Sequence, residues 1–168
     1  PTLRVALRDF YGFEGDRLEE AVHVYREYYA GKGLFECRLY DGVPETLARL
    51  KQAGIHLYLA TSKGEHLARR LLDHLDIARY FEYAGGSDAA GTLDNKEKVL
   101  RYTAETVGVT DFSRAAMVGD GTGDMQAART LGLYAVGVSY GFSTRRQLLD
   151  AGAEVLLSDF QALERLAI

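Results

Sequence analysis

Two aspartates stand close together in the stretch MVGDGTGDMQAARTLG, residues 117–132. Asp120 directly follows an apolar run that is typical of a strand, and Asp124 falls in the first turn of the helix expected after it. A hard cation such as Mg²⁺ takes oxygen ligands, usually one or two carboxylates with water and a substrate phosphate. The glycines within GDGTG would let the backbone turn tightly beside such a cation. Asp120 and Asp124 are therefore candidate Mg²⁺ ligands.

Two other interpretations of this turn stay open. In the first, Thr122 or Gly123 is the N-cap of the helix, and Asp124 is simply favourable near the positive end of the helix dipole. In the second, the G-x-G-x-G spacing is similar to the glycine-rich turn of methyltransferases that bind S-adenosylmethionine. Such a turn normally follows the first strand of a sheet. It is also expected to be followed, after the next strand, by an acid for the ribose, and YAVGVSYGFS (134–143) contains none.

Hydroxyl groups follow a second expected strand, IHLYLAT (55–61). Thr61 ends this strand, and Ser62 stands beside the start of the next helix, where exposed backbone amides favour a phosphate group. Thr61 and Ser62 are therefore candidate phosphate-binding residues. A capping box is the alternative, because Ser62 and Glu65 have the S-x-x-E spacing. It would account for Ser62 and leave Thr61 unexplained.

A lysine stands at the start of the helix that Asp94 or Asn95 should open. Lys96 in the first turn opposes the helix dipole, so the position is unfavourable unless an anion compensates for it. A bound phosphate would be such an anion, whereas an ordinary solvated lysine is the simpler interpretation. Lys98 is a second candidate for the same role, although it lies further into the helix.

After Pro44, apolar runs of strand length alternate with helical patterns. Helices are expected at 44–53, 64–75, 94–107, 123–131 and 144–151, with strands at 55–61, 80–86, 115–120, 134–139 and 154–158, and a last helix after them. Strands separated by single helices predict a Rossmann-like α/β fold, in which a parallel sheet carries helices on both faces. Ligands in such sheets bind at the carboxyl ends of the strands. Helical segments at 3–11 and 17–30 precede this alternation.

Composition narrows the classes of partner. The net charge is −4 and there is no basic stripe, so nucleic acid is not favoured as a partner. No apolar run approaches the length of a membrane span, and no signal-peptide core is present. The single cysteine, Cys37, excludes a disulfide within this sequence and fits a reducing compartment. We expect a cytoplasmic protein that binds neither nucleic acid nor membrane.

The ordered set Thr61, Lys96, Asp120 and Asp124 resembles the haloacid dehalogenase-like (HAD) phosphatases, specifically their phosphoglycolate phosphatase-like branch. LYLATSK is similar to the second motif of that family, LDNKEKVL to the third, and MVGDGTGDMQAA to the fourth. The resemblance implies that Thr61 binds the transferring phosphoryl group and that Lys96 neutralises the phosphate and the nucleophile. It also implies that Asp120 and Asp124 lie at Mg²⁺.

The activity implied by the resemblance is Mg²⁺-dependent hydrolysis of a small phosphomonoester through an aspartyl-phosphate. Phosphoglycolate, a nucleotide and a sugar phosphate all stay open as the small phosphorylated metabolite that would be the partner. The oligomeric state stays open between a monomer and a homodimer. The alternative belongs to a different class of protein. It is a non-catalytic HAD-like domain for binding or interaction, or an inactive fragment.

The first motif of the family, D-x-D-G-T, has no counterpart in this sequence. Asp9 lacks an acid two positions later, and Asp41 follows no strand. By resemblance, residues 1–38 form part of a helical cap and residues 39–168 form the α/β core without its first strand. The nucleophile is then expected upstream of residue 1. Because that strand is central in the family, its removal would split the sheet into two pairs, between the strands at 55–61 and 115–118.

Overall fold

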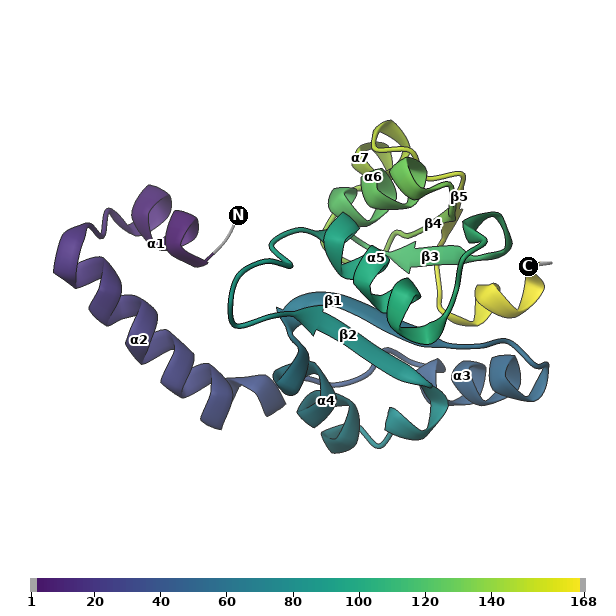
Figure 1. Cartoon of the computed structure of the whole chain (residues 1–168), viewed down its shortest axis with the longest axis horizontal. Helices are drawn as coiled ribbons and strands as arrows, with labels where there is room; N and C mark the ends of the chain where they lie inside the picture. The colour runs from purple at the N-terminus through teal and green to yellow at the C-terminus, as the bar shows by residue number, and fades with distance from the viewer. Residues whose placement is uncertain (1–2, 167–168) are drawn as a thin grey trace. The chain divides into compact units, whose positions relative to one another are not determined.

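The structure is a computed structural model that describes residues 3–166, and the chain divides into two compact units between Arg38 and Leu39 (Figure 1). The first unit contains α1 (Leu3–Tyr11), α2 (Gly15–Gly31) and the short 3-10 helix η1 (Gly33–Phe35). Helix α1 packs against α2, and Arg4 pairs with Glu19 across them. Val22 of α2 and Leu34 of η1 are buried.

The second unit alternates strands and helices as the sequence pattern predicts. Its strands are β1 (Tyr58–Gly64), β2 (Tyr83–Ser87), β3 (Ala116–Gly119), β4 (Tyr134–Val138) and β5 (Val155–Leu157). Its α-helices are α3 (Val43–Gln52), α4 (Glu65–His74), α5 (Lys96–Val107), α6 (Thr122–Leu131) and α7 (Arg145–Asp150). The short 3-10 helices are η2 (Ala78–Tyr80), η3 (Phe112–Arg114) and η4 (Gln161–Arg165). The predicted α/β fold with parallel strands is confirmed.

The strands form two separate sheets. Strand β1 pairs with β2, and the second sheet has the order β3-β4-β5, with every pairing parallel. The division falls between β1 and β3, which is where the sequence analysis expected it. The second sheet has three strands rather than two, because β5 pairs with β4 through Val136 and Val155 and the residues that follow them. Within residues 3–166, β1 and β3 each pair with another strand on one side only.

Strand β4 shows why both faces of its sheet are covered. Successive residues of a strand point to opposite faces. Ala135 lies in an apolar cluster with Met125 and Leu148 from α6 and α7, whereas Val136 lies in another cluster with Leu163 from η4. Burial on both faces is typical of parallel sheets and explains the continuous apolar run in this strand.

Helix α5 lies between the β1-β2 sheet and α6. It packs against β1 and β2 and also against α6, which follows β3 (Figure 1). Its first residue, Lys96, is preceded by the N-cap Asn95, whose side chain accepts a hydrogen bond from the amide of Lys98 (3.0 Å). The first turn of α5 is therefore fixed by a cap, and the helix packs on β1, β2 and α6.

The first two expected strands begin later than predicted, since β2, expected from residue 80, begins at Tyr83 after the 3-10 helix η2. The first strand was predicted at 55–61, but β1 begins at Tyr58, because its partner β2 begins only at Tyr83. The expected last helix is present as the short 3-10 helix η4, in which the amide of Leu163 donates to the carbonyl of Phe160 (3.2 Å).

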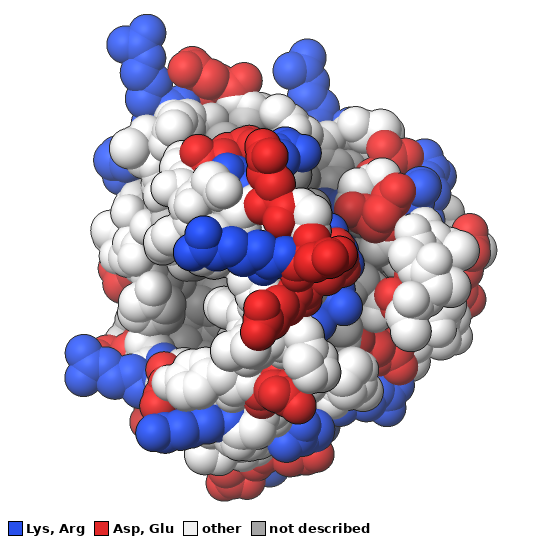
Figure 2. Space-filling view, turned by 90° about the vertical axis from the view of Figure 1, so that its left-hand side faces the viewer, with Lys and Arg blue, Asp and Glu red and all other residues white. Residues whose placement is uncertain are grey.

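The surface carries charges of both signs. On the face drawn in Figure 2, acidic and basic side chains both occur, and neither sign covers the whole face. Across the described residues, no helix combines the length and the apolar character that crossing a membrane requires.

Candidate active site

The turn after β3 holds both aspartates of the fourth motif. Asp120 follows Gly119, the last residue of β3, and Asp124 is the third residue of α6. The N-cap of α6 is Gly121, not Thr122 or Gly123, and its amide donates to Asp124 Oδ2 (3.1 Å). The helix-cap interpretation of Asp124 therefore holds for one of its two carboxylate oxygens.

The second oxygen of Asp124 contacts Lys96. The Lys96 ammonium lies 2.9 Å from Asp124 Oδ1, and it also donates to the backbone carbonyl of Ala60 in β1 (3.0 Å). Both side chains are largely shielded from water, with exposed fractions of 17% for Lys96 and 11% for Asp124. A carboxylate and a carbonyl thus provide the negative partners that a lysine at this end of a helix requires.

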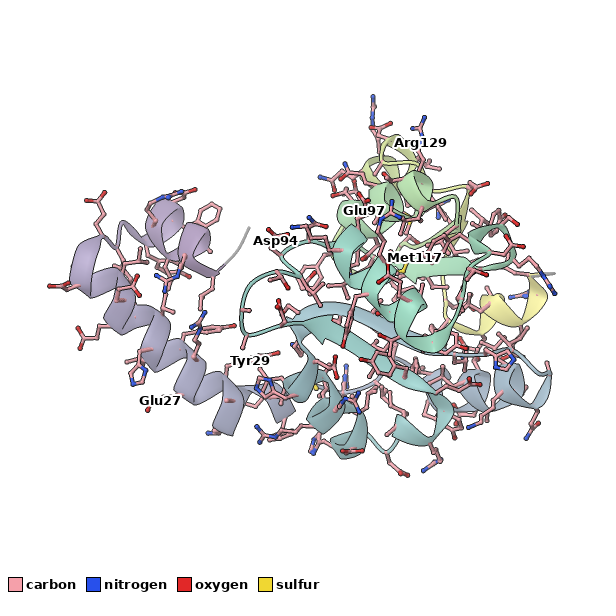
Figure 3. The ribbon with its side chains drawn as sticks, viewed as in Figure 1. Glu27, Tyr29, Asp94, Glu97, Met117 and Arg129 are labelled. Atoms are coloured by element: carbon pink, nitrogen blue, oxygen red, sulfur yellow. The ribbon has the colours of Figure 1, made fainter. Side chains whose placement is uncertain are left out.

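Lys98 has a different environment. Its ammonium pairs with Asp94 at 2.9 Å, and about half or more of each side chain is exposed. Asp94 lies on the loop before α5 (Figure 3), and the Lys98 ammonium lowers the pKa of this carboxyl group, first through the hydrogen bond and then through its charge. Among the ion pairs of the described residues, Lys96 pairs with Asp124 of the fourth motif, whereas Lys98 pairs with Asp94 outside it.

Thr61 was expected to end the strand and Ser62 to stand beside the next helix, but both lie inside β1, which continues to Gly64. The regular pairing with β2 runs through Ala60 and resumes at Gly64, so residues 61–63 form an irregular segment. The Thr61 hydroxyl oxygen accepts a hydrogen bond from the amide of Lys63 (3.2 Å). The proposed capping box of Ser62 with Glu65 is absent, because α4 begins after Gly64 and no side chain caps it.

Asp120 is held by a loop that the sequence analysis did not assign to the site. Phe142, in the loop after β4, donates its amide to Asp120 Oδ2 (3.0 Å), and the amide of Ser143 donates to the Asp120 carbonyl (3.1 Å). A Cβ atom on Gly141 would lie only 2.2 Å from Asp120 Oδ2. A glycine is required here because the backbone passes directly against the carboxylate. The sequence signal is that glycine, which follows β4 at the carboxyl edge of the sheet.

Two other polar residues at strand ends are engaged elsewhere. The Ser139 hydroxyl donates to the carbonyl of Leu157 (3.1 Å). Asp88 accepts hydrogen bonds from the Thr92 hydroxyl (2.6 Å) and the Leu93 amide (2.8 Å), which lower its pKa in that order. Asp88 also lines a cavity of about 480 Å³ between α4 and the loop after β2.

The acid pair fits a magnesium ion better than a metal held by protein ligands alone. Within residues 3–166, no group of three or more His, Cys, Asp or Glu could hold a metal. Mg²⁺ needs only one or two carboxylates when water and a substrate phosphate complete its coordination. A Cβ on Gly119 would lie 2.4 Å from Asp124 Oδ2, so a glycine at the end of β3 leaves the room that the Asp124 carboxylate occupies.

The fold and these motifs define a class of protein. A family model described as "haloacid dehalogenase-like hydrolase" matches residues 4–132. The chain therefore belongs to the HAD-like hydrolases. Its similarity to known phosphatases places it in the phosphoglycolate phosphatase-like branch, as the sequence motifs predicted.

Three comparisons describe this branch. The chain is 34% identical to a 5'-nucleotidase from Pseudomonas aeruginosa, covering 98% of this chain and 74% of that protein. It is 30% identical to a phosphoglycolate phosphatase from Pseudomonas savastanoi pv. phaseolicola, covering 92% of this chain and 56% of that protein. A crystal structure of a predicted phosphatase from Clostridium acetobutylicum is 34% identical, with a TM-score of 0.88 over 98% of this chain and 76% of that chain. Against the phosphoglycolate phosphatase, the chain thus spans little more than half the length of its relative.

Proposed function

We propose that the protein is a phosphatase that hydrolyses a small phosphomonoester with Mg²⁺ held by Asp120 and Asp124. The observation that carries this proposal is the position of the Lys96 ammonium, 2.9 Å from Asp124 Oδ1 and 3.0 Å from the carbonyl of Ala60. A shielded positive charge lies between the hydroxyl-bearing segment of β1 and the acid pair after β3. An anion with several oxygens is the ligand that matches such a set of groups.

The reaction that suits these groups has two displacements. In the first, an aspartate oxygen forms a bond to phosphorus, the bond from phosphorus to the ester oxygen breaks, and the leaving oxygen takes up a proton from solvent to give the alcohol. In the second, water attacks the same phosphorus, and the aspartate is released with inorganic phosphate. Lys96 and the Thr61 hydroxyl, with Ser62 beside it, donate to the phosphoryl oxygens as negative charge develops there. Mg²⁺, when bound, supplies further positive charge for the same group.

The nucleophile is proposed to be an aspartate that follows a strand between β1 and β3. Support comes from the edges of the two sheets. Strand β1 pairs in parallel with β2 and β3 pairs in parallel with β4, and among the described residues β1 and β3 each have one unpaired side. A parallel strand there would end beside Thr61 and Asp120. From the family resemblance, we propose that this strand belongs to a segment upstream of residue 1, and that residues 1–38 are part of a helical cap.

The substrate is proposed from the same class of compounds that the sequence analysis left open. A nucleoside 5'-monophosphate is the first to test, because a relative 34% identical to this chain is named 5'-nucleotidase. Phosphoglycolate and sugar phosphates come next. A cytoplasmic location and a monomeric or homodimeric state belong to the proposal as well.

The test is release of inorganic phosphate by the full-length protein, with and without Mg²⁺. We expect turnover that requires Mg²⁺ and that is lost in the variant Asp120→Asn, while the variant keeps its cooperative unfolding transition. Undiminished activity of Asp120→Asn would contradict the site. A non-catalytic HAD-like domain, the alternative from another class, would show binding of phosphate esters without turnover in any variant.

A further inference from the structure

Phe142 is an aromatic residue that the described residues leave exposed. Its exposed fraction is 98%, although its own amide lies 3.0 Å from Asp120 Oδ2. The phenylalanine ring begins only three bonds from that amide nitrogen, so the ring stays close to the candidate metal ligand. Large apolar side chains in open solvent forgo the free energy of burial, which makes this position notable beside a polar site.

The Phe142 ring is exposed even though its loop is held by several hydrogen bonds. Asp120 is bound by the amides of Phe142 and Ser143, and Gly141 passes directly against its carboxylate. The loop then leads into α7, whose N-cap Thr144 exchanges hydrogen bonds with Gln147 at 2.9 and 3.3 Å. Both ends of the short segment are therefore fixed, and the backbone holds the Phe142 side chain outward.

Tyr140, which precedes Gly141 in the same loop, makes an aromatic contact with Tyr40. The ring of Tyr140 packs edge-on against Tyr40 with 4.9 Å between the ring centres. Burial raises the pKa of Tyr140 to about 12, with smaller contributions from Tyr40, Asp159 and Asp120. Tyr140 is thus a neutral, half-buried support, and Phe142 is the residue of this loop that offers a free aromatic face.

We propose that the Phe142 ring stacks on a planar aromatic leaving group, so that the enzyme prefers nucleoside or aryl phosphomonoesters to aliphatic ones. This inference rests on the proposed function, because the phosphoryl group must be bound among Lys96, Thr61 and Asp120 for the leaving group to extend past Phe142. Aromatic rings bind one another through offset or edge contacts, and a flat base stacks on an aromatic side chain regardless of its hydrogen-bonding pattern. An aliphatic leaving group such as glycerol offers no such face.

The test compares two esters in the full-length protein with Mg²⁺: a nucleoside 5'-monophosphate and glycerol 3-phosphate. Phe142→Ala should lower kcat/KM for the nucleotide about tenfold, mainly through a higher KM, and the loss for glycerol 3-phosphate should be several times smaller. Phe142→Tyr, which keeps the aromatic face, should restore most of the preference. Tyr134→Ala is the matched control, because Tyr134 is an exposed aromatic residue (39%) at the opposite end of β4. It should not change the ratio of the two kcat/KM values.

Equal losses on both esters, or no loss on either, would overturn the proposal. A binding measurement separates this outcome from failure of the proposed function. With 4-fluorophenylalanine placed at position 142, the fluorine NMR signal should shift on addition of the nucleotide with Mg²⁺ and should shift far less with glycerol 3-phosphate. A shift without turnover would count against the phosphatase but not against stacking. If the protein turns over the nucleotide but the fluorine signal does not shift, the stacking role of Phe142 is refuted and the phosphatase proposal stands.

Discussion

The Lys96 ammonium lies 2.9 Å from Asp124 Oδ1 and thereby connects the β1-β2 sheet to the turn after β3. Its other contact, to the carbonyl of Ala60, lies on β1, while Asp124 lies on α6. Within the described residues these two elements belong to parts of the core that no strand pairing connects. One side chain therefore holds together three segments that the sequence motifs placed at the site separately.

This contact should contribute to stability. Replacing Lys96 with methionine leaves the shielded Asp124 carboxylate without its ammonium partner, and we expect a loss of about 2–3 kcal/mol. Lys98→Met is the matched control, because it removes an exposed pair two residues away and should cost about 0.5 kcal/mol or less. Urea unfolding at neutral pH measures both values. Equal losses in the two variants would contradict the shielded character of the Lys96 contact.

Gly141→Ala should disturb the carboxylate of Asp120 without removing any side chain from the site. A Cβ there would lie 2.2 Å from Oδ2, so the loop or the carboxylate has to move. We expect at least a tenfold lower kcat and a higher Mg²⁺ concentration for half-maximal activity. Gly31→Ala, where nothing lies within 4 Å of the added Cβ, provides the comparison. Wild-type Mg²⁺ dependence in Gly141→Ala would show that the loop does not position Asp120.

Gly85→Ala should destabilise the packing of α5 on β2. The added Cβ would lie 2.0 Å from the hydroxyl oxygen of Thr103, a buried residue that donates to the carbonyl of Val99 (2.7 Å). Overpacking of this kind costs about 1–3 kcal/mol. The double variant Gly85→Ala/Thr103→Ala should lose less than the sum of the single losses, because the second change relieves the clash. Strict additivity of the free energies of unfolding would argue against a direct contact.

The pH dependence of stability should reveal the contact between α3 and η4. Glu164 accepts from Arg49 (2.8 Å) and from the buried Thr46 hydroxyl (2.7 Å), and these contacts lower its pKa in that order. Because its pKa is lowered in the folded state, Glu164 contributes to the free energy of unfolding. This contribution is complete above the ordinary glutamate pKa of about 4.3 and is lost as the pH falls through the lowered value. The urea midpoint of the wild type should exceed that of Glu164→Gln at pH 7, and the difference should shrink below about pH 4. A difference independent of pH would contradict this assignment.

The sequence predicts the alternation of strands and helices because apolar runs and helix-stop glycines are local signals. The resemblance to the HAD phosphatases, rather than any local pattern, predicts that the sheet divides between β1 and β3. The start of β1 at Tyr58 was missed, because it depends on where the distant strand β2 begins. The number of strands in the second sheet depends in the same way on a partner, β5.

The candidate site shows a similar limit. An unfavourable lysine at a helix start was visible in the sequence, as was the acid pair after β3. The carbonyl of Ala60 as a partner of Lys96 was not, because any backbone carbonyl carries the same chemistry. The contact of Phe142 with Asp120 joins residues 22 positions apart through a loop geometry that no local pattern encodes.

The most direct test of the central claim compares phosphate release by Lys96→Met and Lys98→Met in the full-length protein with Mg²⁺. Both variants lose one lysine from the first turn of α5, and unfolding curves establish that each is folded under the assay conditions. If Lys96 binds the transferring phosphoryl group, its variant should lose activity about a hundredfold or more, while Lys98→Met stays within about twofold of the wild type. Comparable activity in the two variants would contradict the account.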